Sequence, residues 1–138
     1  MKTIDVKKVD IDNLQPYSIY KPEVLKFDND RILKLLSYYE ADKENTMYIL
    51  NELYNNRELL PKEFCIPDTL VRTEEGYEGF LIKEIKNSIE LGDVLESDYF
   101  SHEEKIDYLK KIGSILRACD ESRKHKNLKK LAIGDVHE

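Results

Sequence analysis

The apolar residues of this 138-residue chain change their spacing near residue 66, and this change strongly constrains the fold. Before it, Met47, Leu50, Leu53 and Tyr54 recur three and four positions apart, which is the spacing of one buried helix face. After it, Phe80-Leu81-Ile82 is apolar at consecutive positions, as in a strand that is covered on both faces. A chain with both patterns is predicted to be α+β, and its length is that of one domain.

The first 27 residues have the features of short strands. Ile4 and Val6 alternate with polar neighbours, whereas Pro16 and Pro22 exclude a helix across this stretch. We therefore expect two or three strands here, one of which ends near Lys26. The expected sheet is small and antiparallel.

Two helices are expected next in the chain. Asp28 and Asn29 are good N-cap residues, and the apolar residues after them fit a helix over residues 31–40. The stripe that contains Met47 predicts a second helix over residues 43–55, and Pro61 forbids its continuation.

The second half of the chain contains three recognisable signals. Residues 66–85 are predicted to form a hairpin, with Gly76 supplying the positive φ that a tight turn needs. A short helix is expected over residues 91–95. Ser101 and Glu104 then form a capping box, which predicts the start of a long helix that ends near Ser122.

The net charge and the cysteines limit the kinds of function that the chain can have. A net charge of −6 argues against general binding of nucleic acids or anionic membranes. Neither a signal peptide nor an apolar window of membrane-spanning length is found, so the cytoplasm is the expected location and no membrane contact is expected. Cys65 and Cys119 stand among apolar residues, and both are expected to be buried thiols.

Three segments carry a resemblance to a known family. They are Val24-Leu25-Lys26-Phe27, the stretch from Gly79 through Ile85 to Leu95, and Ile133-Gly134-Asp135-Val136-His137. In this order, and over about residues 15–138, the chain resembles the protein-kinase-like superfamily, with its aminoglycoside and choline phosphotransferase branch as the nearer match. The resemblance implies residues 1–85 as a nucleotide-binding lobe, and residues 86–138 as a hinge, a long helix and the start of a catalytic loop.

The resemblance also implies roles for particular residues. Lys26 would reach the α- and β-phosphates of a nucleotide, and Asp135 would accept the proton of the attacking hydroxyl. The backbone at Glu84, Ile85 and Lys86 would bind the adenine edge. Glu44 is the candidate ion-pair partner of the lysine, with Thr46 as the alternative position. The residues fix no cofactor by themselves, and the resemblance implies ATP with Mg²⁺.

The chain departs from the family pattern at two places. The stretch 15–21, where a glycine-rich loop is expected, contains no glycine, so any phosphate cradle would be built from Ser18 and Tyr20. The chain also stops before the asparagine and aspartate that hold magnesium in that family. We therefore expect negligible phosphotransfer by this chain alone. His102, His125 and His137 have no ligand spacing, and no metal site is expected.

Each candidate residue also has an ordinary structural interpretation. Lys26 fits a strand lysine on a solvent-exposed face, and Asp135 fits a solvated residue near the C-terminus. Glu44 fits the acidic first turn of a helix, where it complements the helix dipole. The sequence leaves both interpretations open for all three residues.

Three functions follow from these observations. The first is a non-catalytic kinase-like module that binds a protein or another macromolecule and binds nucleotides weakly at most. The second is a fragment of an active phosphotransferase whose metal-binding residues are supplied elsewhere. The third is a small acidic inhibitor, of the kind phages use, directed at a nucleic-acid enzyme. An incomplete fold would expose apolar surface, so a protein partner or self-association is expected.

Overall fold

The structure is a computed structural model that describes the backbone of residues 1–37 and 43–126 and the side chains of residues 1–37 and 43–121. Within these ranges the fold is α+β, as predicted, with a six-stranded sheet and four α-helices. The chain divides into two compact units. We call residues 1–57 with 65–84 the sheet unit, and residues 58–64 with those from Ile85 onward the helical unit.

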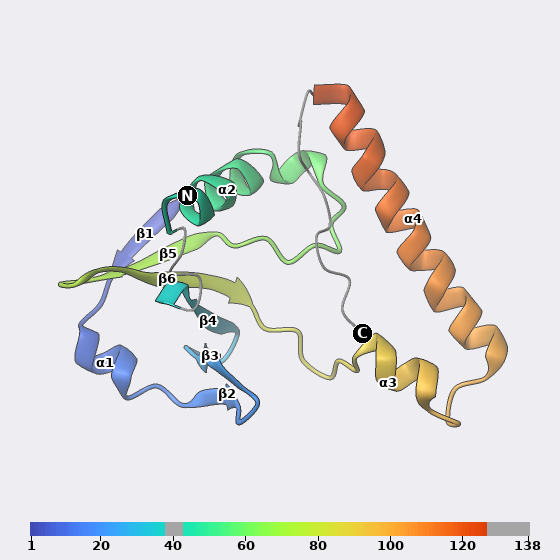
Figure 1. Cartoon of the computed structure of the whole chain (residues 1–138), viewed down its shortest axis with the longest axis horizontal. Helices are drawn as coiled ribbons and strands as arrows, with labels where there is room; N and C mark the ends of the chain where they lie inside the picture. Colours follow the sequence, from blue (N-terminus) through green and yellow to red (C-terminus); the bar gives the residue numbers. More distant parts are fainter. Residues whose placement is uncertain (38–42, 127–138) are drawn as a thin grey trace. The chain divides into compact units, whose positions relative to one another are not determined.

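The sheet unit is built on one mixed sheet. Its strands, in chain order, are β1 (Lys2–Asp5), β2 (Pro16–Ser18), β3 (Lys21–Lys26), β4 (Arg31–Leu35), β5 (Thr69–Thr73) and β6 (Gly76–Lys83). Their order across the sheet is β1-β5-β6-β4-β3-β2 (Figure 1). The pair β1 and β5 is parallel and every other pair is antiparallel, so the sheet is mixed where an antiparallel one was expected.

Both faces of the sheet carry a buried apolar cluster. On one face, Ile11 of helix α1 (Lys8–Asp12) packs in a cluster with Leu33 and Leu81. On the other, Leu50 of helix α2 (Lys43–Asn55) packs in a cluster with Phe80. Neighbouring residues of a strand point to opposite faces, so β6 must be apolar at consecutive positions. This confirms the interpretation of the run 80–82 as a strand covered on both faces.

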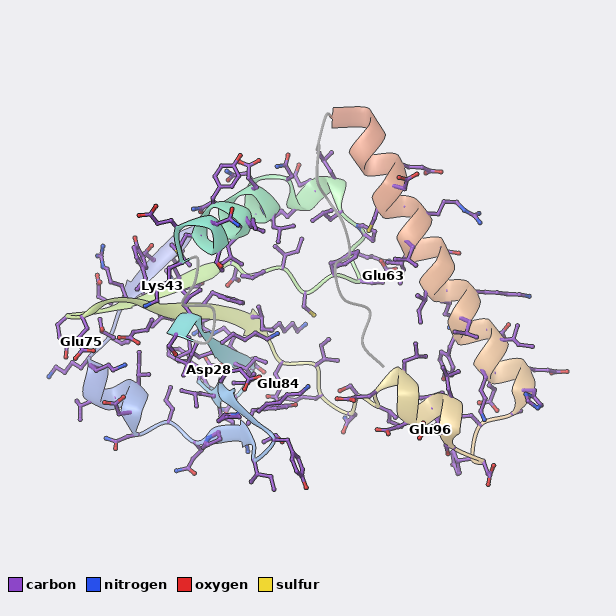
Figure 2. The ribbon with its side chains drawn as sticks, viewed as in Figure 1. Asp28, Lys43, Glu63, Glu75, Glu84 and Glu96 are labelled. Carbon is purple, nitrogen blue, oxygen red and sulfur yellow. The ribbon has the colours of Figure 1, made fainter. Side chains whose placement is uncertain are left out.

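The prediction of a helix over residues 31–40 is wrong for residues 31–35, which form strand β4, and residues 38–40 lie outside the described ranges. Asp28 accepts hydrogen bonds from the backbone N–H groups of Asp30 (2.9 Å) and Arg31 (2.8 Å), as an N-cap residue would. These bonds instead stabilise the turn between β3 and β4 (Figure 2). Strand β4 lies between β3 and β6 in the sheet, so strand partners on both sides override the helical spacing.

The predicted hairpin is confirmed as β5 and β6. Gly76 has φ of +111° in the turn, as expected. Glycine is required at position 79 for a steric reason. A Cβ atom there would overlap the carbonyl oxygen of Lys34 on the neighbouring strand β4. The close approach of β4 and β6 therefore requires a residue without a side chain at this position.

The N-terminal region is extended only in part. Strands β1, β2 and β3 fit the expectation, and β3 ends at Lys26 as predicted, but helix α1 was not expected. A remote contact explains this helix. The carboxylate of Glu74 accepts the backbone N–H of Lys8 at 3.1 Å, and the Lys8 ammonium pairs with Glu78 at 2.9 Å. These partners are distant in the sequence, so no local pattern signals the helix.

The helical unit contains α3 (Leu91–Glu96) and α4 (His102–Lys126), and both were predicted. The capping box is confirmed in both directions. Ser101 accepts the N–H of Glu104 at 3.1 Å, and Glu104 accepts the N–H of Ser101 at 3.3 Å. Helix α4 continues past the predicted end at Ser122. None of the described helices combines the length and apolar composition that crossing a bilayer requires.

The two cysteines differ in environment. Cys119 on α4 is buried as predicted, and burial raises the pKa of its thiol. The prediction for Cys65 is wrong, because its side chain is exposed in the irregular segment before β5. Apolar sequence neighbours signal burial only where a regular element turns the residue inward.

Candidate functional site

Lys34 is a cation within an apolar row of the sheet. The register places Leu70 opposite Phe80, Phe80 opposite Lys34, and Lys34 opposite Val24, so the row crosses four strands. Residues directly opposite each other share a face, and Phe80 belongs to the cluster under α2. Lys34 therefore lies on the face of the sheet that α2 covers.

The strand neighbours of Lys34 are apolar in the described part of the chain. Its side chain is half-buried between the buried residues Val24 and Phe80, which favours packing of the methylene stem and exposure of the charged head. It makes no ion pair with any side chain in the described ranges. A lysine held on a central strand in this way is a positioned positive charge of the kind that binds phosphate.

Lys26, which the sequence indicated as the phosphate-binding lysine, is placed differently. It is the last residue of β3, pairs with Ile32 of β4, and is exposed. The register puts it on the same face of the sheet as Lys34. Its ammonium has more freedom than that of Lys34, because it stands at a strand end without buried neighbours on both sides.

Lys26 and Lys34 stand on successive strands of one antiparallel meander. The meander consists of β2, β3 and β4, with Lys26 at the end of β3 and Lys34 within β4, and α2 is the next helix described after it. The sequence signal was present in Ile32-Leu33-Lys34, but it was hidden by the prediction of a helix over these residues.

The candidate partners of the lysine lie in the first turn of α2. Glu44 is exposed and forms no ion pair with Lys26 or Lys34 within the described ranges, whereas Thr46 is half-buried. The structure therefore does not bring a carboxylate of α2 to either lysine. The choice between the two positions stays open.

The three predicted hinge residues fall on both sides of the boundary between the units. Glu84 is the last residue of the sheet unit, and its N–H donates to the carbonyl of Asp30 at 2.8 Å, which extends the pairing beyond β6 (Figure 2). Ile85 and Lys86 belong to the helical unit and are exposed. The carbonyl of Ile85 accepts the Ser88 hydroxyl at 3.3 Å. Two backbone groups of the predicted hinge thus have internal partners.

The turn between β2 and β3 occupies the place of the expected phosphate loop. The N–H of Tyr20 donates to the Ser18 hydroxyl at 3.1 Å, so the two residues named as a cradle are engaged with each other. Ile19 and Tyr20 are each 85% exposed. The turn therefore presents apolar side chains, and the N–H of Tyr20 already has a partner.

The predicted catalytic-loop residues and a metal site are not part of the described site. Asp135 and His137 lie outside the described residues. In the parts of the chain that the structure describes, no three His, Cys, Asp or Glu side chains gather closely enough to hold a metal ion. The described site thus consists of Lys34 and the apolar row around it.

Comparison of the chain with protein-family models, with curated proteins and with solved structures finds no match. The functional assignment therefore depends on the chemistry and geometry of this chain's own residues.

Proposed function

We propose that this chain is a kinase-like module that binds nucleotide phosphates weakly through Lys34 and acts by binding a protein. One observation carries the nucleotide part of this proposal. Lys34 stands in a row with Phe80 and Val24 on the third strand of the meander β2-β3-β4, and α2 is the next helix described after it. The phosphate-binding lysine of protein kinases likewise stands on a third strand, before the helix that carries its glutamate partner. Lys26, which the sequence indicated, is the competing candidate and is exposed at the end of β3.

The same geometry supports weak binding. A single lysine without a glycine-rich loop offers one charge-assisted contact, and an exposed ion pair contributes about 0–1 kcal/mol. A dissociation constant of 1 mM requires about 4 kcal/mol, so this contact by itself gives an affinity weaker than about 1 mM. A nucleotide at this site would act as a low-affinity ligand.

Titration of the protein with ATP, followed by NMR, tests this part of the proposal. The Lys34→Met variant is expected to lose the shifts caused by ATP, because the positioned ammonium is absent. Lys26→Met is the matched control, since it removes the same charge from the same face of the sheet, and it is expected to bind ATP as the wild type does. Loss of binding in Lys26→Met with retention in Lys34→Met would contradict the assignment.

Exposed apolar side chains support the protein-binding part. In the helical unit they occur at the entry to α4 and along it, where Tyr99 is 88%, Ile106 50% and Leu109 48% exposed. Apolar groups gathered on a surface favour association with another chain. Light scattering at high concentration is expected to show self-association, or a pull-down a stable partner; a monomer without any partner would contradict this part.

An active phosphotransferase remains the alternative, and it is supported by the same observation, a lysine on a strand of the meander that precedes α2 in the chain. In that case another segment would supply the magnesium ligands. A phosphotransfer assay with ATP and Mg²⁺ separates the two functions, because the favoured proposal expects no turnover by this chain. We also propose a cytoplasmic location, supported by the two free cysteines, of which Cys65 is exposed.

A further inference from the structure

The charge of the chain is concentrated in one stretch of the helical unit. Residues 90–107 contain seven of the chain's 28 acidic residues and one of its 22 basic residues. Their net charge is −6, which equals that of the whole chain, so the other residues together are neutral. The stretch covers α3, the connection to α4 and the first turns of α4.

An aromatic surface lies in the middle of this stretch. Tyr99, in the connection between α3 and α4, is 88% exposed, and its ring meets that of Phe100 edge to face at 5.6 Å. Phe100 in turn meets Tyr108 of α4 at 6.1 Å, and Tyr108 is 38% exposed. We call Tyr99, Phe100 and Tyr108 the aromatic corner.

Exposed carboxylates surround the aromatic corner in the sequence and on the helices. Asp98 directly precedes Tyr99, Glu103 and Asp107 follow on the first turns of α4, and Asp93 and Glu96 are on α3. All five are exposed. Figure 2 labels Glu96. An apolar aromatic surface with an acidic rim is complementary to a chain that combines cations with flat, weakly hydrated groups.

Arginine has this combination of properties. Its guanidinium stacks on aromatic rings and also forms bidentate bonds to carboxylates, which the strongly hydrated ammonium of lysine does less well. The chain itself places cations over rings, with Arg57 over that of Tyr54 at 4.2 Å and Arg31 over that of Phe27 at 5.3 Å. In the aromatic corner, Lys111 lies over the ring of Tyr108 at 5.6 Å, so Tyr99, which is 88% exposed, is the ring that a partner's arginine would use. Nucleic acids and anionic membranes would be repelled by the rim.

We infer that the aromatic corner is a docking surface for an arginine-rich segment of a partner protein. Tyr99 provides the stacking platform, and Asp98 and Glu103 provide carboxylates for the arginines. This inference rests on the protein-binding part of the proposed function and is independent of nucleotide binding at Lys34.

Fluorescence anisotropy with a labelled octa-arginine peptide tests the inference, with octa-lysine as the comparison peptide. Octa-arginine is expected to bind more tightly than octa-lysine, and high salt is expected to weaken both. Tyr99→Ala is expected to weaken octa-arginine binding about threefold to fivefold. Tyr20→Ala is the matched control, because Tyr20 is 85% exposed and its neighbour is Lys21, and it is expected to leave binding unchanged.

Two double variants, each of which removes two negative charges, test the carboxylates around the aromatic corner. Asp98→Asn with Glu103→Gln is expected to weaken octa-arginine binding about threefold to tenfold. Asp10→Asn with Glu52→Gln changes the net charge equally within the sheet unit, and is expected to have little effect. Circular dichroism checks that every variant is folded.

Three results would overturn the inference. They are equal weakening by the two double variants, unchanged binding by Tyr99→Ala, and equal affinity for the two peptides. Each would mean that binding is a response to net charge alone. Lys34→Met is expected to bind octa-arginine normally, so loss of ATP binding and loss of peptide binding are distinguishable. Displacement of the octa-arginine peptide by Ca²⁺ at low concentration would also contradict the inference, since such displacement would indicate a cation site.

Discussion

Two segments of this protein begin with the same kind of hydrogen bond and continue as different secondary structures. Asp28 accepts the N–H groups two and three residues ahead, and Ser101 accepts the N–H three residues ahead. Strand β4 follows the first residue and helix α4 follows the second. A side chain that satisfies the next N–H groups is therefore compatible with either element.

The difference between the two segments is in length and in neighbours. Strand β4 is a short apolar run, paired on one side with β3 and on the other with β6, and its Leu33 has no exposed surface. Helix α4 is long, and its capping box is reciprocated by Glu104. A short apolar run takes its structure from the strands beside it, whereas a long, capped segment satisfies its backbone internally.

Leu33→Ala tests the dependence of β4 on its neighbours, and the largest effect is expected there. Deleting a wholly buried side chain between two strands is expected to lower the free energy of unfolding by about 3 kcal/mol. Leu109→Ala on α4 is the control, because Leu109 is 48% exposed, and its effect is expected to be below about 1 kcal/mol. Urea unfolding measures both, and equal effects would contradict the comparison.

Two glycine substitutions, one beside strand β4 and one in helix α4, test the comparison between these two segments in a second way. Gly79→Ala is expected to destabilise the protein by about 2 kcal/mol, because the new methyl group would overlap the Lys34 carbonyl oxygen and separate β4 from β6. In Gly113→Ala the methyl group meets no atom within 4 Å, and the better helix former is expected to stabilise α4 by about 1 kcal/mol. Thermal unfolding of the two variants should shift in opposite directions.

Removal of the two capping side chains is expected to have similar effects in the protein and different effects in peptides. Asp28→Ala and Ser101→Ala are each expected to cost about 1 kcal/mol. In a peptide of residues 99–126, Ser101→Ala should lower the helix content measured by circular dichroism. In a peptide of residues 24–37, Asp28→Ala should change nothing, and regular structure in that peptide would contradict our account of β4.

The smallest expected effect is the pH dependence of the turn at Asp28. The Arg31 side chain, followed by backbone N–H groups, holds the pKa of this carboxyl below its ordinary value of 3.8. Because the folded-state pKa is lowered, the stabilisation is complete above the ordinary value and is lost as the pH falls through the lowered one. Asp28→Asn should therefore approach the stability of the wild type in acid. A difference that is independent of pH would exclude the charge of Asp28 as its cause.

Much of the fold could be predicted from local patterns. The helix at residues 43–55, the hairpin with Gly76 and the capped helix at Ser101 each have a signal contained within a few turns of chain. Helix α1 could not be predicted, since the carboxylate that accepts the Lys8 N–H belongs to Glu74. Strand β1 likewise depends on pairing with β5, far along the chain.

The position of the candidate lysine depends on which segments are strands. The resemblance of Val24-Leu25-Lys26-Phe27 indicated Lys26, and Lys34 was not considered because residues 31–40 were predicted to be helical. Once residues 31–35 are a strand, Lys34 precedes α2 and lies between Val24 and Phe80. The assignment of the lysine thus depended on the secondary structure of one short segment.

The sequence by itself determined the α+β class, the capped helix at Ser101, the turn glycine at residue 76 and the concentration of acidic residues over 90–107. Only the tertiary structure decided that Arg31–Leu35 is a strand, that α1 begins at Lys8, and which lysine stands in the apolar row. The physical reason is the range of the interactions. Caps and helical stripes act within a few residues, whereas strand pairing and remote carboxylates act between segments that only folding brings together.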